Sequence, residues 1–270
     1  MRSSANPQNV YAHVAAARIY AKFGHKAEAM AEFDAALKIK PESYIYINRS
    51  QTRDPGDYAA RLADLDMALK LEPLSESVAI ERAALLTDQR NYPGAITALT
   101  AMLAAHPDDL HALLLRGIAH AKNNDAAPAE KDLVAAHGLA KDAQDFNNLC
   151  WEKATHDVSL PSALADCDAA VARAPTSASY LDSRGFVLLR LDRLDEAKKS
   201  YDAALAQNPM LAGSLYGRAV VDARRGDRTG SAADAAAALK ADPDVKGEFT
   251  HYGVTLDAPA DKTAAPAKTS

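Results

Sequence analysis

Seven prolines recur along this chain of 270 residues at a spacing close to 34 residues or twice that. Proline inside a helix costs about 3 kcal/mol, because it lacks an N–H donor and clashes with the preceding turn, so prolines mark helix boundaries. A regular series of such boundaries predicts a repeated structural unit. The series is Pro7, Pro41, Pro73, Pro107, Pro175, Pro209 and Pro243, with one interval of 32 residues between Pro41 and Pro73.

Between these prolines each segment reads as two amphipathic helices. In residues 178–209, the first helical pattern carries Gly185 and Leu188 and the second carries Tyr201 and Ala204. The apolar residues recur there every three or four positions, which is the period of one face of an α-helix. Small residues stand where two helices have to approach closely, so each segment predicts a helical hairpin.

This pattern resembles the tetratricopeptide repeat, a helical hairpin of 34 residues with small and aromatic residues at fixed positions. The resemblance implies an all-α fold, a right-handed superhelical solenoid that occupies residues 1–253. It covers about nine tenths of the chain, although no repeat has Trp at the family's tryptophan position. The seven implied repeats span residues 10–43, 44–75, 76–109, 110–143, 144–177, 178–211 and 212–245.

The second repeat and the C-terminal end depart from the regular pattern. The second repeat is two residues short, and Pro55 in its RDPGD sequence predicts a clipped first helix. After the last repeat we expect a short capping helix, in which Phe249 and Tyr252 cover the last hairpin. Residues 254–270 have no apolar period, so we expect them to form a disordered tail.

The N-terminal end allows two interpretations. The sequence NPQN is either a simple helix-starting turn or the end of an earlier repeat. The second alternative would leave Val10, Val14 and Ala17 without a covering neighbour. An exposed apolar face of that kind favours self-association through the uncapped first repeat.

Charge and hydropathy exclude two classes of partner. The formal net charge is -5 and the pI about 5.9, so the chain as a whole is not drawn to nucleic acid. No apolar run is long enough to insert into a membrane. The first ten residues, MRSSANPQNV, lack the apolar core of a secretory signal peptide. We expect a cytoplasmic location by default, or a periplasmic one if a leader has been removed.

The sequence contains none of the common catalytic or metal-binding motifs. There is no H-E-x-x-H, no G-x-S-x-G, no phosphate-cradling glycine loop and no paired CxxC. We therefore expect a protein that is not an enzyme and that needs no cofactor or metal.

The two cysteines allow three interpretations. Cys150, His156 and Asn148 are residue types of a cysteine hydrolase, but six residues of helix place Cys150 and His156 on different faces. We favour a packing role, in which Cys150 and Cys167 meet inside a hairpin as free buried thiols. An oxidising compartment would allow a disulfide between them instead.

The sequence ARRGDRTG at residues 223–230 combines a basic cluster with an Arg-Gly-Asp triplet. The repeat phase places it at the turn between the two helices of the last hairpin. We interpret it as turn chemistry and give less weight to adhesion or nucleic-acid binding, because no aromatic residue interleaves the arginines.

Charged residues recur in register with the repeats. An arginine precedes the small residue of most first helices, and an aspartate recurs on second helices. Together they predict a ladder of charge-assisted contacts between helices. The members are Arg49, Arg82, Arg116, Arg184 and Arg218 with Asp66, Asp168 and Asp202.

By resemblance, the first helices of the repeats line a concave face that binds a peptide or a partner helix. The middle of this face is apolar and is flanked by Tyr44 and Phe186, which favours a ligand anchored by apolar side chains. The Lys and Asn set that clamps a peptide carboxylate in one branch of the family is not present at these positions. The candidate groove residues are Tyr44, Ile47, Asn48, Ile80, Glu81, His111, Leu114, Leu115, Ile118, Asn148, Glu152, Asp182, Phe186 and Tyr216.

We therefore predict a non-enzymatic, bacterial protein-interaction scaffold or adaptor that binds a protein or peptide. The alternative is the C-terminal repeat region of a larger bacterial envelope protein with a transglutaminase-like or other enzymatic domain, because NNLCW followed by ALADCDAA resembles the repeat regions of some such proteins. An enzyme in its own right would need a cluster of polar groups with perturbed pKa values, and the linear sequence indicates none.

Overall fold

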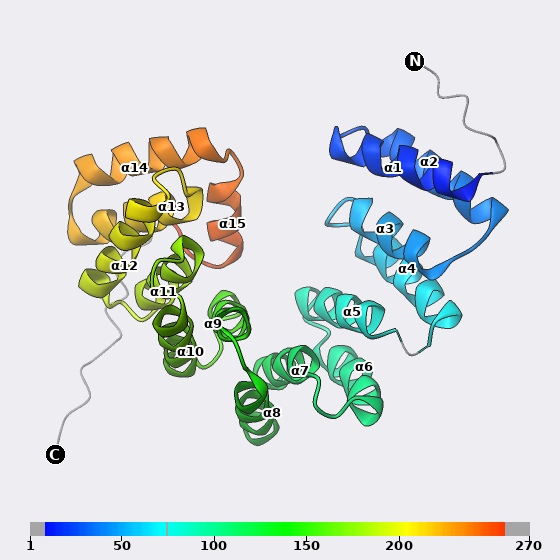
Figure 1. Cartoon of the computed structure of the whole chain (residues 1–270), viewed down its shortest axis with the longest axis horizontal. Coiled ribbons are helices and arrows are strands. Elements are labelled where there is room, and N and C mark those ends of the chain that lie inside the picture. Colours follow the sequence, from blue (N-terminus) through cyan, green and yellow to red (C-terminus); the bar gives the residue numbers. More distant parts are fainter. Residues whose placement is uncertain (1–8, 74, 257–270) are drawn as a thin grey trace. The chain divides into compact units, whose positions relative to one another are not determined.

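The computed structural model describes residues 9–73 and 75–256, and these residues form fifteen helices and no strand. The all-α expectation is therefore confirmed. Figure 1 shows the helices following one another as hairpins in chain order. Their bounds are α1 (Val10–Lys22), α2 (Lys26–Ile39), α3 (Ser43–Thr52), α4 (Tyr58–Leu71), α5 (Glu76–Asp88), α6 (Tyr92–Ala105), α7 (Leu110–Lys122), α8 (Ala126–Leu139), α9 (Ala143–Thr155), α10 (Leu160–Arg173), α11 (Ala178–Arg190), α12 (Leu194–Gln207), α13 (Ala212–Arg225), α14 (Arg228–Ala241) and α15 (Val245–His251).

The chain divides into two compact units, residues 1–133 and 134–270, and the division falls within α8. The first unit contains α1 to α7, and the second contains α9 to α15. Within each unit, the two helices of a hairpin pack on each other, and neighbouring odd-numbered helices also touch. The odd-numbered helices come first in their hairpins. We call the surface that they form in each unit its first-helix face.

The turn inside most hairpins uses one residue with left-handed backbone geometry. These residues occupy the same repeat position and have φ between 56° and 86°: Gly24, Arg90, Asn124, Asp192 and Gly226. In the last hairpin, Gly226 ends α13, and Asp227 caps α14 by accepting a hydrogen bond from the Gly230 N–H at 2.9 Å. The interpretation of the Arg-Gly-Asp triplet as turn chemistry is confirmed.

Helix ends follow from local sequence. α3 ends at Thr52, directly before RDPGD, and has 10 residues where α1 has 13. The clipped helix predicted from Pro55 is confirmed. Several helices begin with a side chain that accepts a hydrogen bond from an N–H of the first turn. The capping residues are Asn9, Asp57, Asn91, Asp109, Asp142 and Asp227.

The buried ring of Tyr201 on α12 explains two of the glycines on first helices. A Cβ added to Gly185 of α11 would lie 2.7 Å from Cε1 of this ring. A Cβ added to Gly217 of α13 would lie 2.3 Å from Cζ. Both distances are far below van der Waals contact, so only glycine lets the two helices close on the tyrosine.

The predicted arginine ladder is present. Each arginine of the ladder is half-buried and pairs with an aspartate on a second helix, 15 or 16 residues away. Asp66, Asp168 and Asp202 all take part, and further aspartates join them. The pairs are Arg49–Asp34, Arg49–Asp64, Arg82–Asp66, Arg116–Asp132, Arg184–Asp168, Arg218–Asp202 and Arg218–Asp234.

The apolar residues exposed on α1 differ from those expected. Val14 is 7% exposed and Ala17 is fully buried, and both lie in a core cluster against which Val10 packs. The exposed face that the second interpretation of the N-terminal end assigned to these three residues is therefore wrong. The large apolar side chains exposed in this region are Tyr11 and Ile19 of α1 and Phe23, the residue directly after α1. The expected tail at residues 254–270 lies almost entirely outside the described residues.

Candidate functional site

In the first unit, the predicted groove residues on α3 and α5 lie side by side on the first-helix face. Gln51 donates a hydrogen bond from Nε2 to Glu81 Oε2 at 3.1 Å, which joins the two helices. Asn48 donates from Nδ2 to the backbone oxygen of Tyr44 at 2.6 Å. All five predicted residues of these helices are half-buried, and part of each side chain remains accessible: Tyr44, Ile47, Asn48, Ile80 and Glu81.

The predicted groove residues on α7 lie mostly in the interior. Leu114 and Ile118 are fully buried, and Leu115 is 6% exposed. Their side chains contribute to packing and offer no free surface to a ligand. Only His111 of this set is exposed.

A recess of about 460 Å³ opens between α1 and α3 on the first-helix face of the first unit. It includes the predicted groove residue Asn48, and its other lining residues come from α1, the first residue of α2, α3 and the loop after α3. We call it the cationic recess. Its lining residues are Arg18, Ala21, Lys22, Lys26, Asn48, Gln51, Thr52, Arg53 and Pro55.

The charges that line this recess are all positive. Lys26 is paired with Asp54, and Arg53 donates from Nε to Asp64 at 2.7 Å. The two remaining cations, on α1, make no ion pair with any residue that the structure describes, and both are exposed. These two are Arg18 and Lys22. They are the groups of the recess that are available to an anionic ligand.

In the second unit, the predicted polar groove residues lie on α9 and α11. Asn148 is exposed, and Glu152 and Asp182 are half-buried. Asp182 accepts a hydrogen bond from Ser214 Oγ at 2.5 Å. Burial raises the pKa of Asp182 to about 6, and the hydrogen bond from Ser214 opposes this shift in part.

The two predicted aromatic groove residues of the second unit are covered by the chain's own C-terminal segment. Phe186 and Tyr216 are each 1% exposed. The ring of Phe249 on α15 lies 5.6 Å from that of Phe186 and 4.9 Å from that of Tyr216, between ring centroids. Tyr252, the residue after α15, lies 5.6 Å from Trp151 of α9. The segment therefore covers α9, α11 and α13, and reaches beyond the last hairpin.

The second unit also buries an ion pair that sequence reasoning missed. Lys153 is fully buried, and its Nζ donates to Asp166 Oδ2 at 2.5 Å and to Ser162 Oγ at 2.9 Å. His137 Nδ1 lies 2.6 Å from the other oxygen of Asp166. The repeat spacing could have indicated this burial. Lys153 occupies the repeat position that Val187 occupies 34 residues later, and Val187 is buried. The described part of the chain has no group of three His, Cys, Asp or Glu residues placed to hold a metal ion.

Cys150 and Cys167 form a disulfide between α9 and α10, with their Cα atoms 5.2 Å apart. Both residues are fully buried. The expectation of free thiols is therefore wrong. The hydrolase interpretation also fails, because a bonded sulfur is no nucleophile, and His156 Nδ1 lies against the backbone oxygen of Glu152 at 2.9 Å.

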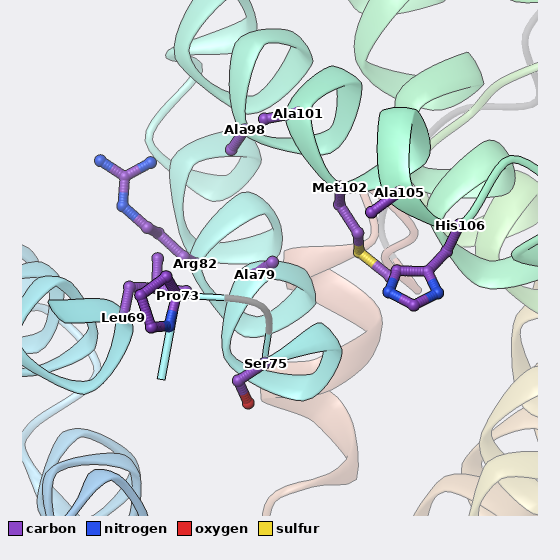
Figure 2. Close-up of a pocket in the computed structure, with 10 residues that line it drawn as sticks. All are labelled: Leu69, Pro73, Ser75, Ala79, Arg82, Ala98, Ala101, Met102, Ala105 and His106. Atoms are coloured by element: carbon purple, nitrogen blue, oxygen red, sulfur yellow. The ribbon is translucent and has the colours of Figure 1, made fainter. Parts of the chain in front are cut away.

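A second pocket, of about 290 Å³, lies between α4, α5 and α6 of the first unit. Figure 2 shows Leu69 and Pro73 on one side of it and Met102 and His106 on the other. Its lining is mainly apolar, and the Arg82 side chain at its edge pairs with Asp66. None of the predicted groove residues lines this pocket.

Sequence profiles of the tetratricopeptide repeat match residues 10–43, 80–144 and 184–245, which together make up more than half of the chain. The chain belongs to the tetratricopeptide repeat family. Tetratricopeptide repeat proteins are in general non-enzymatic scaffolds, and the repeat fold suggests a scaffold for protein–protein interaction here. No curated protein sequence matches this tetratricopeptide repeat protein.

Solved structures with the same fold include a tetratricopeptide repeat protein from Parabacteroides merdae, with a TM-score of 0.61 and 14% identity over 91% of this chain and 99% of that one. Yeast Tom70 has a TM-score of 0.66 and 16% identity over 92% of this chain and 55% of its own. The human IFIT1 dimer with PPP-AAAA has a TM-score of 0.53 and 16% identity over 88% of this chain and 63% of that one. Identities this low show the fold alone.

Proposed function

We propose that this tetratricopeptide repeat protein is a non-enzymatic scaffold and that an acidic peptide segment of its partner binds at the cationic recess. The observation that carries the proposal is the pair of exposed cations on α1, Arg18 and Lys22, which have no counter-ion among the described residues. A carboxylate placed between them forms charge-assisted hydrogen bonds without first having to break an existing ion pair.

The neighbouring polar residues suit the backbone of an extended peptide. Asn48 and Gln51 stand in the same recess, and each carries both a donor and an acceptor. Beyond the recess, Ile47 and Ile80 offer partly exposed apolar surface on α3 and α5. The face therefore fits a segment in which acidic residues are followed by apolar ones.

The charge of the whole chain argues against a nucleic acid as the anion. The formal net charge of -5 repels a polyanion at long range, while a short acidic peptide feels mainly the local cations. A bilayer-spanning role has no support either, since no helix in the described ranges is both long and apolar enough to cross a membrane.

Fluorescence anisotropy with a labelled glutamate-rich peptide tests the proposal. The variant Arg18→Glu/Lys22→Glu should weaken binding of this peptide by about tenfold or more, because two charge-assisted contacts become repulsive. Both side chains are exposed, and neither forms an ion pair with a described residue, so the variant should keep its fold, which circular dichroism would check.

The matched control is Lys38→Glu/Lys70→Glu, which changes the net charge equally at exposed positions outside the recess. It should weaken binding by no more than about threefold, through long-range charge alone. Equal losses in the two variants, or tighter binding of a lysine-rich peptide by the unmodified protein, would contradict the assignment.

A further inference from the structure

We propose that the first-helix face of the second unit is a docking site for a partner helix with two aromatic residues three positions apart. The chain's own α15, together with Tyr252 directly after it, is the resident occupant of this site. Phe249 and Tyr252 are such a pair, and both rings contact Phe186 on this face. An external helix with the same pair binds by exchange with α15. This proposal is independent of the cationic recess, because it concerns the other unit.

The face is built to hold two rings. Phe186 meets Phe249 and Tyr252 at centroid distances of 5.6 and 5.8 Å with interplanar angles of 86° and 75°. Trp151 meets Tyr252 at 5.6 Å and 85°. Such edge-to-face contacts are favourable because the positive edge of one ring meets the negative face of another. The shape of the site therefore selects for aromatic side chains over aliphatic ones.

A cation fixes the end of the bound segment through its backbone. Arg190 donates from Nη1 to the backbone oxygen of Tyr252, and its Nη2 lies 2.9 Å from Asp157 Oδ1. The same guanidinium lies 6.0 Å from the ring centroid of Phe186. Every peptide has a backbone carbonyl, so an external helix can accept this hydrogen bond as α15 does.

Several features of α15 make exchange feasible. The helix has seven residues, a length that is marginal on its own, so its contact with the face holds it in place. Pro243 lies between α14 and α15, and α14 ends independently at Ala241. Gly247 lowers the helix propensity of α15 further, and a Cβ added there would meet nothing within 4 Å.

The test uses a fluorescein-labelled peptide with the sequence of residues 243–256, PDVKGEFTHYGVTL, and the full-length protein. The apparent affinity for the peptide rises with the fraction of protein whose face is open, so weakening the resident helix should tighten binding of the peptide. The variant Phe249→Ala/Tyr252→Ala should bind it at least about tenfold more tightly than the unmodified protein.

The variant Gly247→Ala should change the affinity for the peptide in the opposite direction, and its added methyl group contacts no residue of the face. Because alanine stabilises α15, this variant should bind the peptide about two- to threefold more weakly than the unmodified protein. A control peptide with alanine in place of the phenylalanine and the tyrosine should not bind measurably. Unchanged affinity in both variants, or equal binding of the control peptide, would overturn the proposal. If the unmodified protein formed dimers that dissociate when the peptide is added, the proposal would also be overturned. The occupant of the face would then be a second copy of the chain.

Hydrogen exchange of the unmodified protein decides the question if the double variant does not fold. Exchange through a local opening predicts that the amides of α15 exchange at least about tenfold faster than those of α11. Equal protection of α11 and α15 would show that α15 is a permanent part of the unit and would overturn the proposal.

Discussion

Arg218 of α13 bridges two aspartates that lie 16 residues on either side of it in the sequence. It donates from Nη1 to Asp202 at 2.8 Å and from Nε to Asp234 at 2.6 Å. These carboxylates raise the pKa of the guanidinium, although its partial burial opposes the shift. The first helix of this hairpin is thereby tied to its own second helix and to the preceding one.

The ladder should contribute unequally to stability, depending on the burial of each carboxylate. Arg116→Met leaves Asp132, whose side chain is 4% exposed, without its cation, which should cost about 2–4 kcal/mol. Arg82→Met frees the half-exposed Asp66 and should cost less than about 1 kcal/mol. Urea unfolding of both variants measures the difference. Equal losses would show that burial of the partner does not matter.

The close approach of α11 and α13 around Tyr201 predicts a steric effect. Gly217→Ala places a methyl group against the buried ring and should destabilise the second unit by about 1–3 kcal/mol. Gly138→Ala is the control, because a Cβ there meets nothing within 4 Å. It should be neutral or stabilising by up to about 1 kcal/mol, through helix propensity. Thermal unfolding of the two variants measures the difference, and equal destabilisation by both would contradict a steric effect specific to the Tyr201 ring.

Asp182 predicts a pH dependence of stability. Its pKa of about 6 in the folded protein exceeds the ordinary value of 3.8, so the folded state holds the proton more tightly than the unfolded state. The resulting stabilisation is fully present below the ordinary pKa and is lost as the pH rises through about 6.

Asp182→Asn should therefore be more stable than the unmodified protein at neutral pH, by about 1 kcal/mol, with the advantage vanishing at low pH. The measurement is the unfolding free energy of both proteins across this range. The key quantity is the unfolding free energy of the variant minus that of the unmodified protein. If this difference were smaller at neutral pH than at low pH, the raised pKa of Asp182 would be contradicted.

The disulfide predicts a response to reductant. Cys150 and Cys167 are 17 residues apart, and closing a loop of that size removes conformational freedom from the unfolded chain. Reduction should lower the free energy of unfolding by about 2–4 kcal/mol. The double variant Cys150→Ala/Cys167→Ala should unfold identically with and without reductant. Alkylation of both thiols in the denatured, unreduced protein would show that the bond does not form.

Much of the fold could be predicted from local sequence, because helix boundaries depend on nearby residues. Pro55 ends the short α3, and Gly226 with Asp227 forms the last hairpin turn. The arginine ladder could also be predicted from the sequence, since its members recur at the repeat spacing. Each of these features needs only the repeat phase and standard helix chemistry.

The candidate site was harder to predict from the sequence, because the burial of a residue depends on which segment covers it. Leu114 and Phe186 occupy predicted groove positions, yet both are buried, and α15 covers Phe186 from a segment more than 60 residues further along the chain. Lys153 finds its partner Asp166 on another helix. Sequence spacing identifies the face of a helix and leaves open which later segment packs on it.

Hydrogen exchange with and without the glutamate-rich peptide is the most direct measurement of the proposed binding site. We expect slower exchange on binding in α1 around Arg18 and Lys22 and in α3 around Asn48, with the second helices of the first unit unchanged. Slowing confined to α4 and α6, around the apolar pocket of Leu69 and Met102, would contradict binding at the cationic recess.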